Sequence, residues 1–267
     1  RLISEIAPAV AKAAMATGVA TRPIEDFDKY QEKLAGFVFR SGMLMKPIFD
    51  RARQDPRRII FAEGEDERVL RAVQALVDDR LARPHLVGRP DVIMKRIERL
   101  GLRIQPDVHF GITNPENDPR YEEYWTLYHK LMERKGVTMD EAKTIIRTNT
   151  TAIAAIALKR GEADAMICGT YGQYEWHLKD VVDVIGKAKG VKDVSALSAL
   201  ILSKGTYFLC DTHVSPDPTA EEIAEMTELS AETVRRFGMT PKVALLSHSN
   251  FGSSNCPSAR KMRDAME

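Results

Sequence analysis

The stretch IIFAEGEDERVLRAVQALV, residues 59–77, decides the fold class. Its first four residues form a short β-branched and aromatic run that is typical of a buried strand. An acidic turn follows at 63–66, and apolar residues then recur at helical spacing through 69–77. A strand, a loop and a helix in this order predict the first part of a βαβ unit.

The alternation of strands and helices continues along the rest of the chain. Further strands are expected at 84–88, 163–168, 207–210 and 243–246, and another begins at 103–104. Helices are expected at 92–100, 121–135, 140–158 and 219–237, the last with a capping box at its start. This rhythm is typical of parallel sheets built from βαβ units. We therefore predict an α/β protein with a mostly parallel sheet flanked by helices, in αβα layers.

The N-terminal part of the chain has a different pattern. Residues 4–17 and 27–39 have helical spacing, and neither run contains a strand. An apolar segment from Met43 to Phe49 then leads into the first strand, so we place a domain boundary near residue 43. Because the chain begins with Arg1 and stops inside a helical pattern, we expect a fragment of a longer protein.

Composition excludes several classes of protein. The 267 residues are 44% hydrophobic and 29% charged, which is typical of a folded globular chain. The 39 Lys and Arg nearly balance the 38 Asp and Glu, so no overall field attracts nucleic acid or a membrane. No run approaches the roughly 18 apolar residues of a membrane span, and the N-terminus does not resemble a signal peptide. We expect a soluble, cytoplasmic protein without nucleic-acid or membrane partners.

The cysteines favour a reducing compartment. They are odd in number, far apart and without a CxxC pair, which argues against a disulfide framework or a structural zinc site: Cys168, Cys210 and Cys256. Cys168 and Cys210 end apolar runs, so we expect both to be buried structural thiols.

Polar loops after the predicted strands are the places where a ligand would bind, because ligands of parallel α/β sheets lie beyond the carboxyl ends of the strands. Four such loops occur, at 63–66, 169–172, 211–213 and 247–254. The last is rich in serine and directly precedes a helix expected from Pro257, whose first N–H groups favour a phosphate. The alternative is a loop that only caps this helix.

Sequence signatures of nucleotide and metal sites are missing. The chain contains no GxGxxG, GxxxxGK[ST], HExxH or EF-hand pattern. The acidic turn at 63–66 is therefore expected to be the acid-rich start of a helix. Asp211 follows a strand and is expected to point into the crevice, whereas Arg147 is expected to be a solvated charge. Three histidines are general bases by type, but no spacing supports a catalytic triad: His177, His213 and His248.

Four longer segments carry a family resemblance. GEADAMICG at 161–169, VIGKAKGVKDVSALSALIL at 184–202, CDTHVSPDPTAEEIAEM at 210–226 and PKVALLSHSNFGS at 241–253 together resemble the phosphate acetyltransferase family. The resemblance covers about four-fifths of the chain. It implies the isocitrate/isopropylmalate dehydrogenase-like fold of that family, with a first lobe at 44–190 and an incomplete second lobe at 191–267.

Two other segments narrow the resemblance. AVAKAAMATGVATRPI at 9–24 and GTYGQYEWHL at 169–178 resemble the large bacterial hybrid malic enzymes, which carry a C-terminal acetyltransferase-like domain. Residues 1–43 would then be the last helices of the malic enzyme catalytic domain and a linker. The resemblance implies a homo-oligomer that decarboxylates malate to pyruvate and CO2 with NADP and Mg²⁺ or Mn²⁺, through catalytic and metal-binding residues that would precede Arg1.

One departure from the acetyltransferase pattern decides the expected role of this chain. Active members of that family carry a Leu-Arg pair whose Arg helps to hold phosphate, and the aligned pair here is Leu178–Lys179. Lys keeps the charge but loses the two-pronged geometry. The resemblance therefore implies a regulatory domain that binds acetyl-CoA as an effector, with no cofactor, metal site or catalytic residue in this part of the chain.

The expected ligand-binding residues lie in the loops described above and on the following helix. They are Thr170, Lys179, Asp211, Thr212, Ser247, Ser249, Asn250, Gly252 and Ser253. Two alternatives stay open: an active phosphate acetyltransferase that makes acetyl-CoA from acetyl phosphate and CoA, and an oligomerisation platform whose cleft no longer binds a ligand.

Overall fold

The computed structural model describes residues 2–38, 40–202 and 204–267. Its internal contacts divide the chain into two compact units. One unit is Phe49–Lys189, and the other combines Arg1–Ile48 with Gly190–Glu267. The predicted division at residues 43 and 190 stays a prediction. The apolar segment 43–49 lies within one helix, and the side chains of Met43 and Leu44 are outside the described part.

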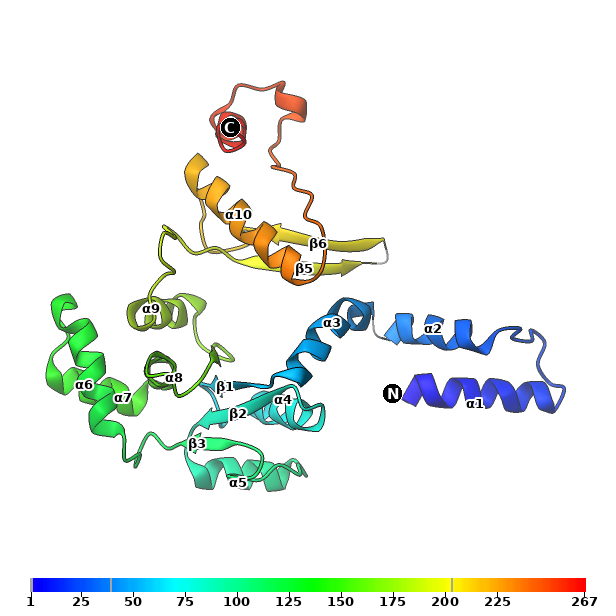
Figure 1. Ribbon diagram of the computed structural model, residues 1–267, viewed down its shortest axis with the longest axis horizontal. Helices are drawn as coiled ribbons and strands as arrows, with labels where there is room; N and C mark the ends of the chain where they lie inside the picture. The colour runs from blue at the N-terminus through cyan, green and yellow to red at the C-terminus, as the bar shows by residue number, and fades with distance from the viewer. Residues whose placement is uncertain (1, 39, 203) are drawn as a thin grey trace. The chain divides into compact units, whose positions relative to one another are not determined.

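The unit Phe49–Lys189 is built around a four-stranded parallel sheet. Its strands stand in the order β3-β2-β1-β4, and Figure 1 labels the first three of these. Their bounds are β1 Arg57–Phe61, β2 Ala82–Val87, β3 Gly111–Thr113 and β4 Ala165–Ile167. In the register, Phe61 pairs with Leu86 on one side and with Ile167 on the other. The predicted α/β class with a parallel sheet flanked by helices is confirmed.

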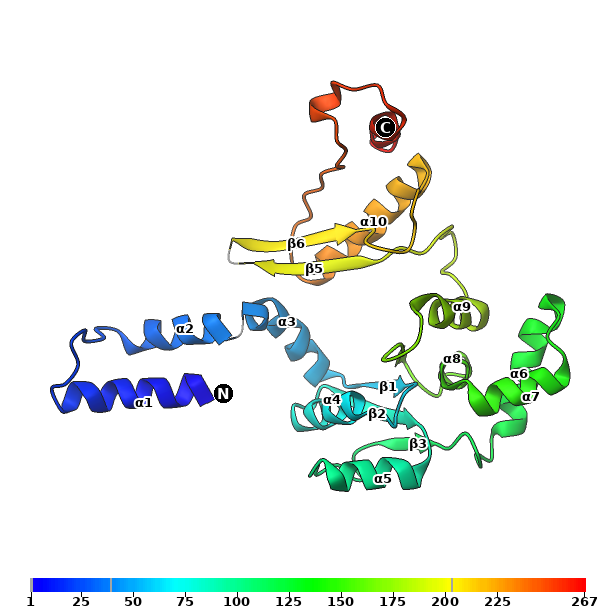
Figure 2. The same cartoon turned by 180° about the vertical axis from the view of Figure 1, so that it is seen from behind.

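Helices cover both faces of this sheet. Neighbouring residues of a strand point to opposite faces, so they pack against different helices. Phe61 packs into a core with α4 and α5, whereas Ile60 packs into a second core with the later helices. Figure 2 shows the same layers from behind. The helices are α4 Glu67–Asp78, α5 Pro90–Arg99, α6 Tyr121–Met132, α7 Met139–Thr148, α8 Thr150–Lys159 and α9 Tyr174–Val184.

Two expectations for this unit are wrong. The single helix predicted at 140–158 is broken at Asn149, which has an extended backbone, ends α7 and caps α8 through its side chain. Apolar periodicity does not reveal this break, because both helices continue the apolar pattern. The strand predicted at 103–104 is also absent: Ile104 is buried in the core without strand pairing, and the third strand is β3.

The N-terminal helices are α1 Leu2–Ala16, α2 Phe27–Val38 and α3 Arg40–Gln54. Helix α1 ends at Ala16 and is followed by Gly18, whose φ of 75° suits glycine. The carboxylate of Asp26 accepts hydrogen bonds from the backbone N–H groups of Asp28 and Lys29 and so caps α2. The ammonium group of Lys12 lies 5.1 Å from the Phe27 ring centroid, so α1 and α2 pack together.

The second half of this unit contains a hairpin and two helices. They are the antiparallel strands β5 Leu197–Leu202 and β6 Gly205–Cys210, with α10 Ala220–Arg236 and α11 Pro257–Asp264. Phe237, directly after α10, packs on Phe208 of the hairpin, and their ring centroids are 5.5 Å apart. The predicted capping box of α10 is present. The strand predicted at 243–246 is wrong: these residues have no regular structure, because no strand pairs with them in the described part of the chain.

None of the helices in the described residues combines the length and the apolar character needed to cross a bilayer.

Candidate functional site

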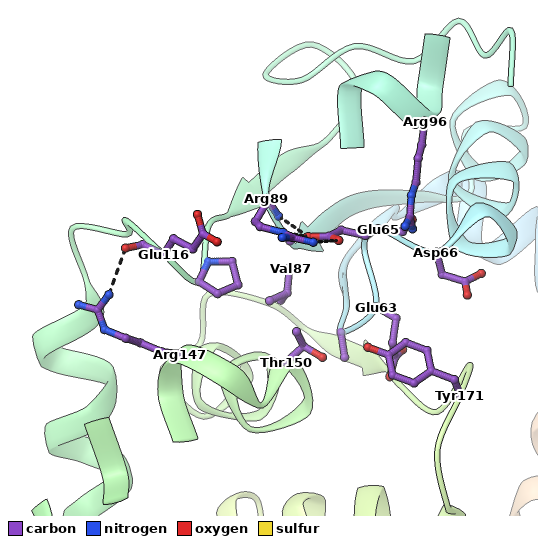
Figure 3. A pocket seen from close by; sticks show the side chains of 13 residues that line it. Glu63, Glu65, Asp66, Val87, Arg89, Arg96, Glu116, Arg147, Thr150 and Tyr171 are labelled. Atoms are coloured by element: carbon purple, nitrogen blue, oxygen red, sulfur yellow. Dashed lines mark hydrogen bonds and ion pairs between the residues drawn. The ribbon is translucent and has the colours of Figure 1, made fainter. Parts of the chain in front are cut away.

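A cavity of about 390 Å³ lies at the carboxyl edge of the parallel sheet (Figure 3). Residues that follow all four strands line it, as expected for ligand sites of this architecture. The lining residues are Ala62, Glu63, Glu65, Asp66, Val87, Gly88, Arg89, Arg96, Pro115, Glu116, Arg147, Thr150 and Tyr171. All of them belong to the unit Phe49–Lys189.

The acidic turn after β1 holds the local backbone in place. Asp66 caps α4 by accepting a hydrogen bond from the N–H of Arg68, so the predicted helix start is confirmed. Glu65 accepts two hydrogen bonds from the Arg89 guanidinium and one from the Arg89 backbone N–H. These bonds hold the pKa of the Glu65 carboxyl below its usual value, although burial opposes them. Glu65 and Arg89 thus form an ion pair with each other.

Glu63 differs from the other acids of the turn because its side chain is only 2% exposed. Its Oε1 accepts a hydrogen bond of 2.9 Å from the backbone N–H of Gly169, which follows β4. Its Oε2 is buried and has no hydrogen-bond partner in the described part of the structure. Glu63 was expected only as part of the acidic turn at 63–66, and its place two residues after β1 was the available signal.

The loop after β4 is fixed by His177 of α9. The Nε2–H of His177 donates to the carbonyl oxygen of Tyr171 at 2.7 Å, which leaves Nδ1 to accept from the Thr151 hydroxyl at 2.8 Å. Gly172 has a φ of 91°, and a Cβ there would meet His177 Nε2 at 3.0 Å. His177 is therefore a positioning residue for this loop.

Thr170, a predicted ligand-binding residue, lies in the same loop. Its carbonyl oxygen accepts a hydrogen bond of 2.6 Å from Arg68, so the loop after β4 is tied to the start of α4. Its Oγ1 is buried and has no hydrogen-bond partner in the described residues. The structure thus brings the predicted loops 63–66 and 169–172 together at one sheet edge.

Lys179 stands on α9 with its side chain 70% exposed. Its Nζ donates to Asp183 Oδ2 at 2.6 Å, one helical turn further along, and this hydrogen bond raises the pKa of Lys179. Asp183 also pairs with Lys135. The ammonium group at this position therefore already has a carboxylate partner.

Arg147 is exposed, as predicted, but it also lines the cavity. Its guanidinium carbon lies 4.1 Å from the Tyr121 ring centroid, and its Nη1 donates to the Glu116 carbonyl oxygen at 3.3 Å. Neither contact is with a carboxylate, so the Arg147 guanidinium has no acidic partner among the described residues. Arg147 can therefore face an anion in the cavity.

Asp211 and Thr212 follow β6, in the other unit. The Asp211 carboxylate accepts hydrogen bonds from the backbone N–H groups of Ala196, Val214 and Ser215. Burial raises the pKa of Asp211, but these donors outweigh burial and hold it below its usual value. The Asp211 carboxylate is directed at its own loop rather than outward into a crevice, and its role in ligand binding stays a prediction.

The serine-rich loop is held largely by its own hydroxyl groups. The Ser247 hydroxyl accepts from the N–H of Ser249, and the Ser249 hydroxyl accepts from the N–H of Ser254. A short 3-10 turn runs over Asn250–Gly252, and Ser253 is exposed after it. Helix α11 follows at Pro257 as predicted, with Cys256 rather than a serine at its cap. The alternative that the loop's serines only cap the helix is therefore wrong for the described residues, and phosphate binding by this loop stays a prediction.

A cysteine–histidine pair lies at the start of α11 and was missed by the sequence analysis. Cys256 Sγ is 3.0 Å from His248 Nε2 and 3.5 Å from the Ser258 hydroxyl. Hydrogen bonds from Ser254, Ser258, the Ala259 amide and His248 lower the pKa of this thiol to about 6. The cysteine follows the histidine by eight positions, so only the fold of the loop reveals the pair.

The other two cysteines differ from each other. Cys168 is half-buried against the core, and burial raises its pKa to about 11; its structural role stays a prediction. Cys210 is exposed, so the expectation that it is buried is wrong. It ends a strand of a two-stranded hairpin, where no further strand of the described residues covers it. No group of three or more His, Cys, Asp or Glu in the described residues could hold a metal ion.

Comparison with known proteins identifies the family. The phosphate acetyl/butaryl transferase family matches residues 43–267. The whole chain is 58% identical to an NAD-dependent malic enzyme of Rhizobium meliloti and 56% identical to an NADP-dependent malic enzyme of Escherichia coli. It spans only 35% of the length of each of these two enzymes.

Acetyltransferases are more distant relatives. A phosphate acetyltransferase of Clostridium acetobutylicum is 32% identical over 84% of this chain and 68% of its own length. The crystal structure of a phosphotransacetylase from Streptococcus pyogenes matches with a TM-score of 0.77 and 26% identity, over 85% of this chain and 68% of that one. The chain therefore belongs to the phosphate acetyl/butaryl transferase family and corresponds to the C-terminal acetyltransferase-like part of malic enzymes.

Proposed function

We propose that this chain is the acyl-CoA-sensing module of a malic enzyme. In this proposal it binds acetyl-CoA without turning it over, and the bound effector shifts the activity of a malic enzyme catalytic domain in the same polypeptide. The binding residues are those predicted from the sequence: Thr170, Lys179, Asp211, Thr212, Ser247, Ser249, Asn250, Gly252 and Ser253. The full-length protein would be a cytoplasmic homo-oligomer.

The observation that carries the proposal is the ion pair between Lys179 and Asp183. The family resemblance aligns Lys179 with an Arg that holds phosphate in active acetyltransferases. A lysine offers a single point charge instead of a planar fork, and here that charge faces Asp183 at 2.6 Å. Weak phosphate clamping at this position favours binding over transfer of an acetyl group.

The start of α11 supports binding of a phosphate-bearing ligand. The N–H groups at a helix N-terminus and its positive dipole end favour phosphate. The preceding loop keeps its serines in hydrogen bonds to its own backbone, and Ser253 remains exposed. Acetyl-CoA carries several phosphates, so this loop is a suitable contact for part of it.

The activity of the full-length protein is part of the proposal. The similar enzymes are named for malate and for either NAD or NADP. We propose oxidative decarboxylation of malate to pyruvate and CO2 with NADP and with Mg²⁺ or Mn²⁺. Regulation then requires that acetyl-CoA bind one conformational state of the whole protein more tightly than another.

Malate oxidation by the full-length protein tests the regulatory role. Acetyl-CoA is titrated while the reduced dinucleotide is followed, in the unaltered protein and in Lys179→Gln and Lys189→Gln. We expect a saturable change in rate, a higher half-saturating concentration in Lys179→Gln, and no shift in the exposed control Lys189→Gln. A rate that does not respond to acetyl-CoA at any concentration contradicts the proposal.

The enzymatic alternative has a separate assay. Acetyl phosphate and CoA are mixed with the full-length protein, and thioester formation is followed by ultraviolet absorbance. We expect no turnover from folded protein. Steady turnover would assign the chain as an acetyltransferase and would contradict the interpretation of Lys179.

A further inference from the structure

The cavity at the carboxyl edge of the parallel sheet contains a buried acceptor without a donor. Glu63 Oε2 has no hydrogen-bond partner in the described part of the chain, while Oε1 is held by the Gly169 N–H. A buried polar atom that lacks a partner costs stability, and more so when the group is charged. The Glu63 side chain lines the cavity (Figure 3), so a ligand there can supply the missing donor.

An aromatic ring lines the same cavity. It belongs to Tyr171, which is 61% exposed and is labelled in Figure 3. Its backbone is held by His177, which donates to the Tyr171 carbonyl oxygen. A fixed loop with an exposed ring offers a face on which a planar ligand can stack.

The cavity also has a cationic side. Arg89 is paired with Glu65, and Arg96 donates to the Glu65 carbonyl oxygen. Arg147 has no carboxylate partner among the described residues, and the charge of Glu116 acts on Arg89. In Figure 3, Thr150 is drawn between Arg147 and Glu63.

Helix α8 begins at Thr150, so its N-terminal amides lie at the cavity wall. The amide of Ala152 is already capped by Asn149. A helix start, a hydroxyl group and an arginine together suit a phosphate. The buried acceptor and the phosphate-binding groups thus occupy different parts of one cavity.

We propose that this cavity binds an aminopurine nucleotide. The exocyclic amine donates to Glu63 Oε2, the base lies against Tyr171, and the phosphate meets Arg147 and the start of α8. The volume of about 390 Å³ is within the range of small-molecule pockets. The same chemical group occurs in a free nucleotide and in the adenosine end of acyl-CoA, and the experiment below distinguishes these two sources.

Two probes that differ only in the amine test the contact with Glu63. AMP and purine riboside 5′-monophosphate, which lacks the 6-amino group, are titrated calorimetrically into the full-length protein. Saturating NADP is present, so that the dinucleotide site expected of a malic enzyme is filled. We expect AMP to bind about tenfold or more tightly than the probe without the amine, as a hydrogen bond to a charged group would give.

Glu63→Gln is the matched variant. The Gly169 N–H needs an acceptor, so the amide oxygen of the substituted side chain takes the place of Oε1 and its NH2 group takes the place of Oε2. The donor of AMP then meets another donor, and we expect the preference for AMP to disappear. The exposed control Glu122→Gln should keep the preference. Equal binding of the two probes to the unaltered protein, or an unchanged preference in a folded Glu63→Gln protein, overturns the proposal.

A second variant tests the phosphate end and guards against misfolding of Glu63→Gln. Arg147→Gln should weaken AMP binding several-fold and leave adenosine binding unchanged, whereas the exposed control Arg71→Gln should change neither. Loss of affinity for adenosine as well would contradict the assignment of Arg147 to phosphate.

Competition identifies the source of the nucleotide. Mutually exclusive binding of AMP and acetyl-CoA assigns the cavity to the adenosine end of acyl-CoA, and simultaneous binding assigns it to a free nucleotide. The nucleotide proposal does not depend on acyl-CoA sensing. If neither probe binds, the nucleotide site fails, while the response of malate oxidation to acetyl-CoA still decides the proposed function.

Discussion

The ammonium group of Lys179 lies 2.6 Å from the carboxylate of Asp183, one turn further along α9. Asp183 also accepts a hydrogen bond from Lys135, which holds its carboxylate in place. Another cation at position 179 would therefore still face Asp183 across one helical turn. The pair therefore limits what a cation at position 179 can offer to a phosphate.

Lys179→Arg alone should not create an acetyltransferase. The guanidinium would still face Asp183, so the two N–H groups of its planar fork would be used within the helix. We expect thioester formation from acetyl phosphate and CoA to stay at the background level in the full-length variant. A clear gain of turnover in Lys179→Arg would show that the lysine alone blocks catalysis.

Cys256 should be the most reactive thiol of the chain at neutral pH. Its pKa of about 6 makes it mostly thiolate at pH 7, whereas a pKa of about 11 leaves Cys168 almost entirely protonated. Iodoacetamide labelling of a Cys210→Ser protein, read by peptide mass spectrometry, should modify Cys256 first, with a midpoint near pH 6. Ser254→Ala should move that midpoint upward. A midpoint near the ordinary thiol value of 9.0 would contradict the hydrogen-bonded pair.

Asn149→Ala should destabilise the junction of α7 and α8. The Asn149 side chain accepts from the Ala152 N–H and donates to Asp180 Oδ2 at 2.7 Å. Loss of a helix cap costs about 1–2 kcal/mol, so we expect the free energy of unfolding in urea to fall by that amount. Thr148→Ala, at an exposed neighbouring site, should change it by less than about 0.5 kcal/mol. Equal effects of the two variants would argue against the cap.

Stability should fall in acid through carboxylates whose pKa is lowered by folding. Hydrogen bonds from the Arg58 side chain and backbone lower the pKa of Asp164, and Arg89 does the same for Glu65. In the folded protein the pKa values of Asp164 and Glu65 lie below their ordinary values of 3.8 and 4.5. The stabilisation from these carboxylates is therefore fully present when the pH is above the ordinary pKa values, and it is lost as the pH falls through the lowered pKa values of the folded state. Urea midpoints measured between about pH 7 and pH 3 should decline from about pH 4.5 downward.

In Asp164→Asn, the acid-dependent decline of the urea midpoint should be shallower, because one of the titrating groups is removed. A midpoint that is independent of pH over this range would show that these ion pairs add nothing to stability, as is common for exposed pairs.

The sequence predicted the parallel sheet because most of the strands and helices of the first unit carry their own local signal, although β3 at Gly111–Thr113 was not predicted. The run at 59–77 is the clearest case: β1, the cap at Asp66 and α4 lie where the pattern indicated. The break at Asn149 was missed because the apolar pattern continues across it. The cap depends on one side-chain hydrogen bond, to which hydrophobic periodicity is blind.

The strands of the second lobe were harder to predict. A β-branched or apolar run such as 243–246 forms a strand only when another strand pairs with it, and pairing is not a local property. Hairpin β5–β6 formed because its two strands are close in sequence and pair with each other. Residues 243–246 have no such neighbour in the described part of the chain.

The candidate site was predicted as a set of loops but not as a set of contacts. Loops 63–66 and 169–172 lie at one sheet edge, as parallel topology requires. The roles of Glu63 and His177 depend on hydrogen bonds between segments 106 and 26 residues apart, to Gly169 and Thr151. No spacing rule in a single sequence reports such pairs.

We propose that this chain binds acetyl-CoA without turning it over. Titration calorimetry of acetyl-CoA into the full-length protein, in phosphate buffer, tests it most directly. We predict saturable binding with one site per chain and no continuing heat after each injection, because acetyl transfer to phosphate does not occur. The absence of saturable binding, or a steady heat that shows turnover, would contradict the claim.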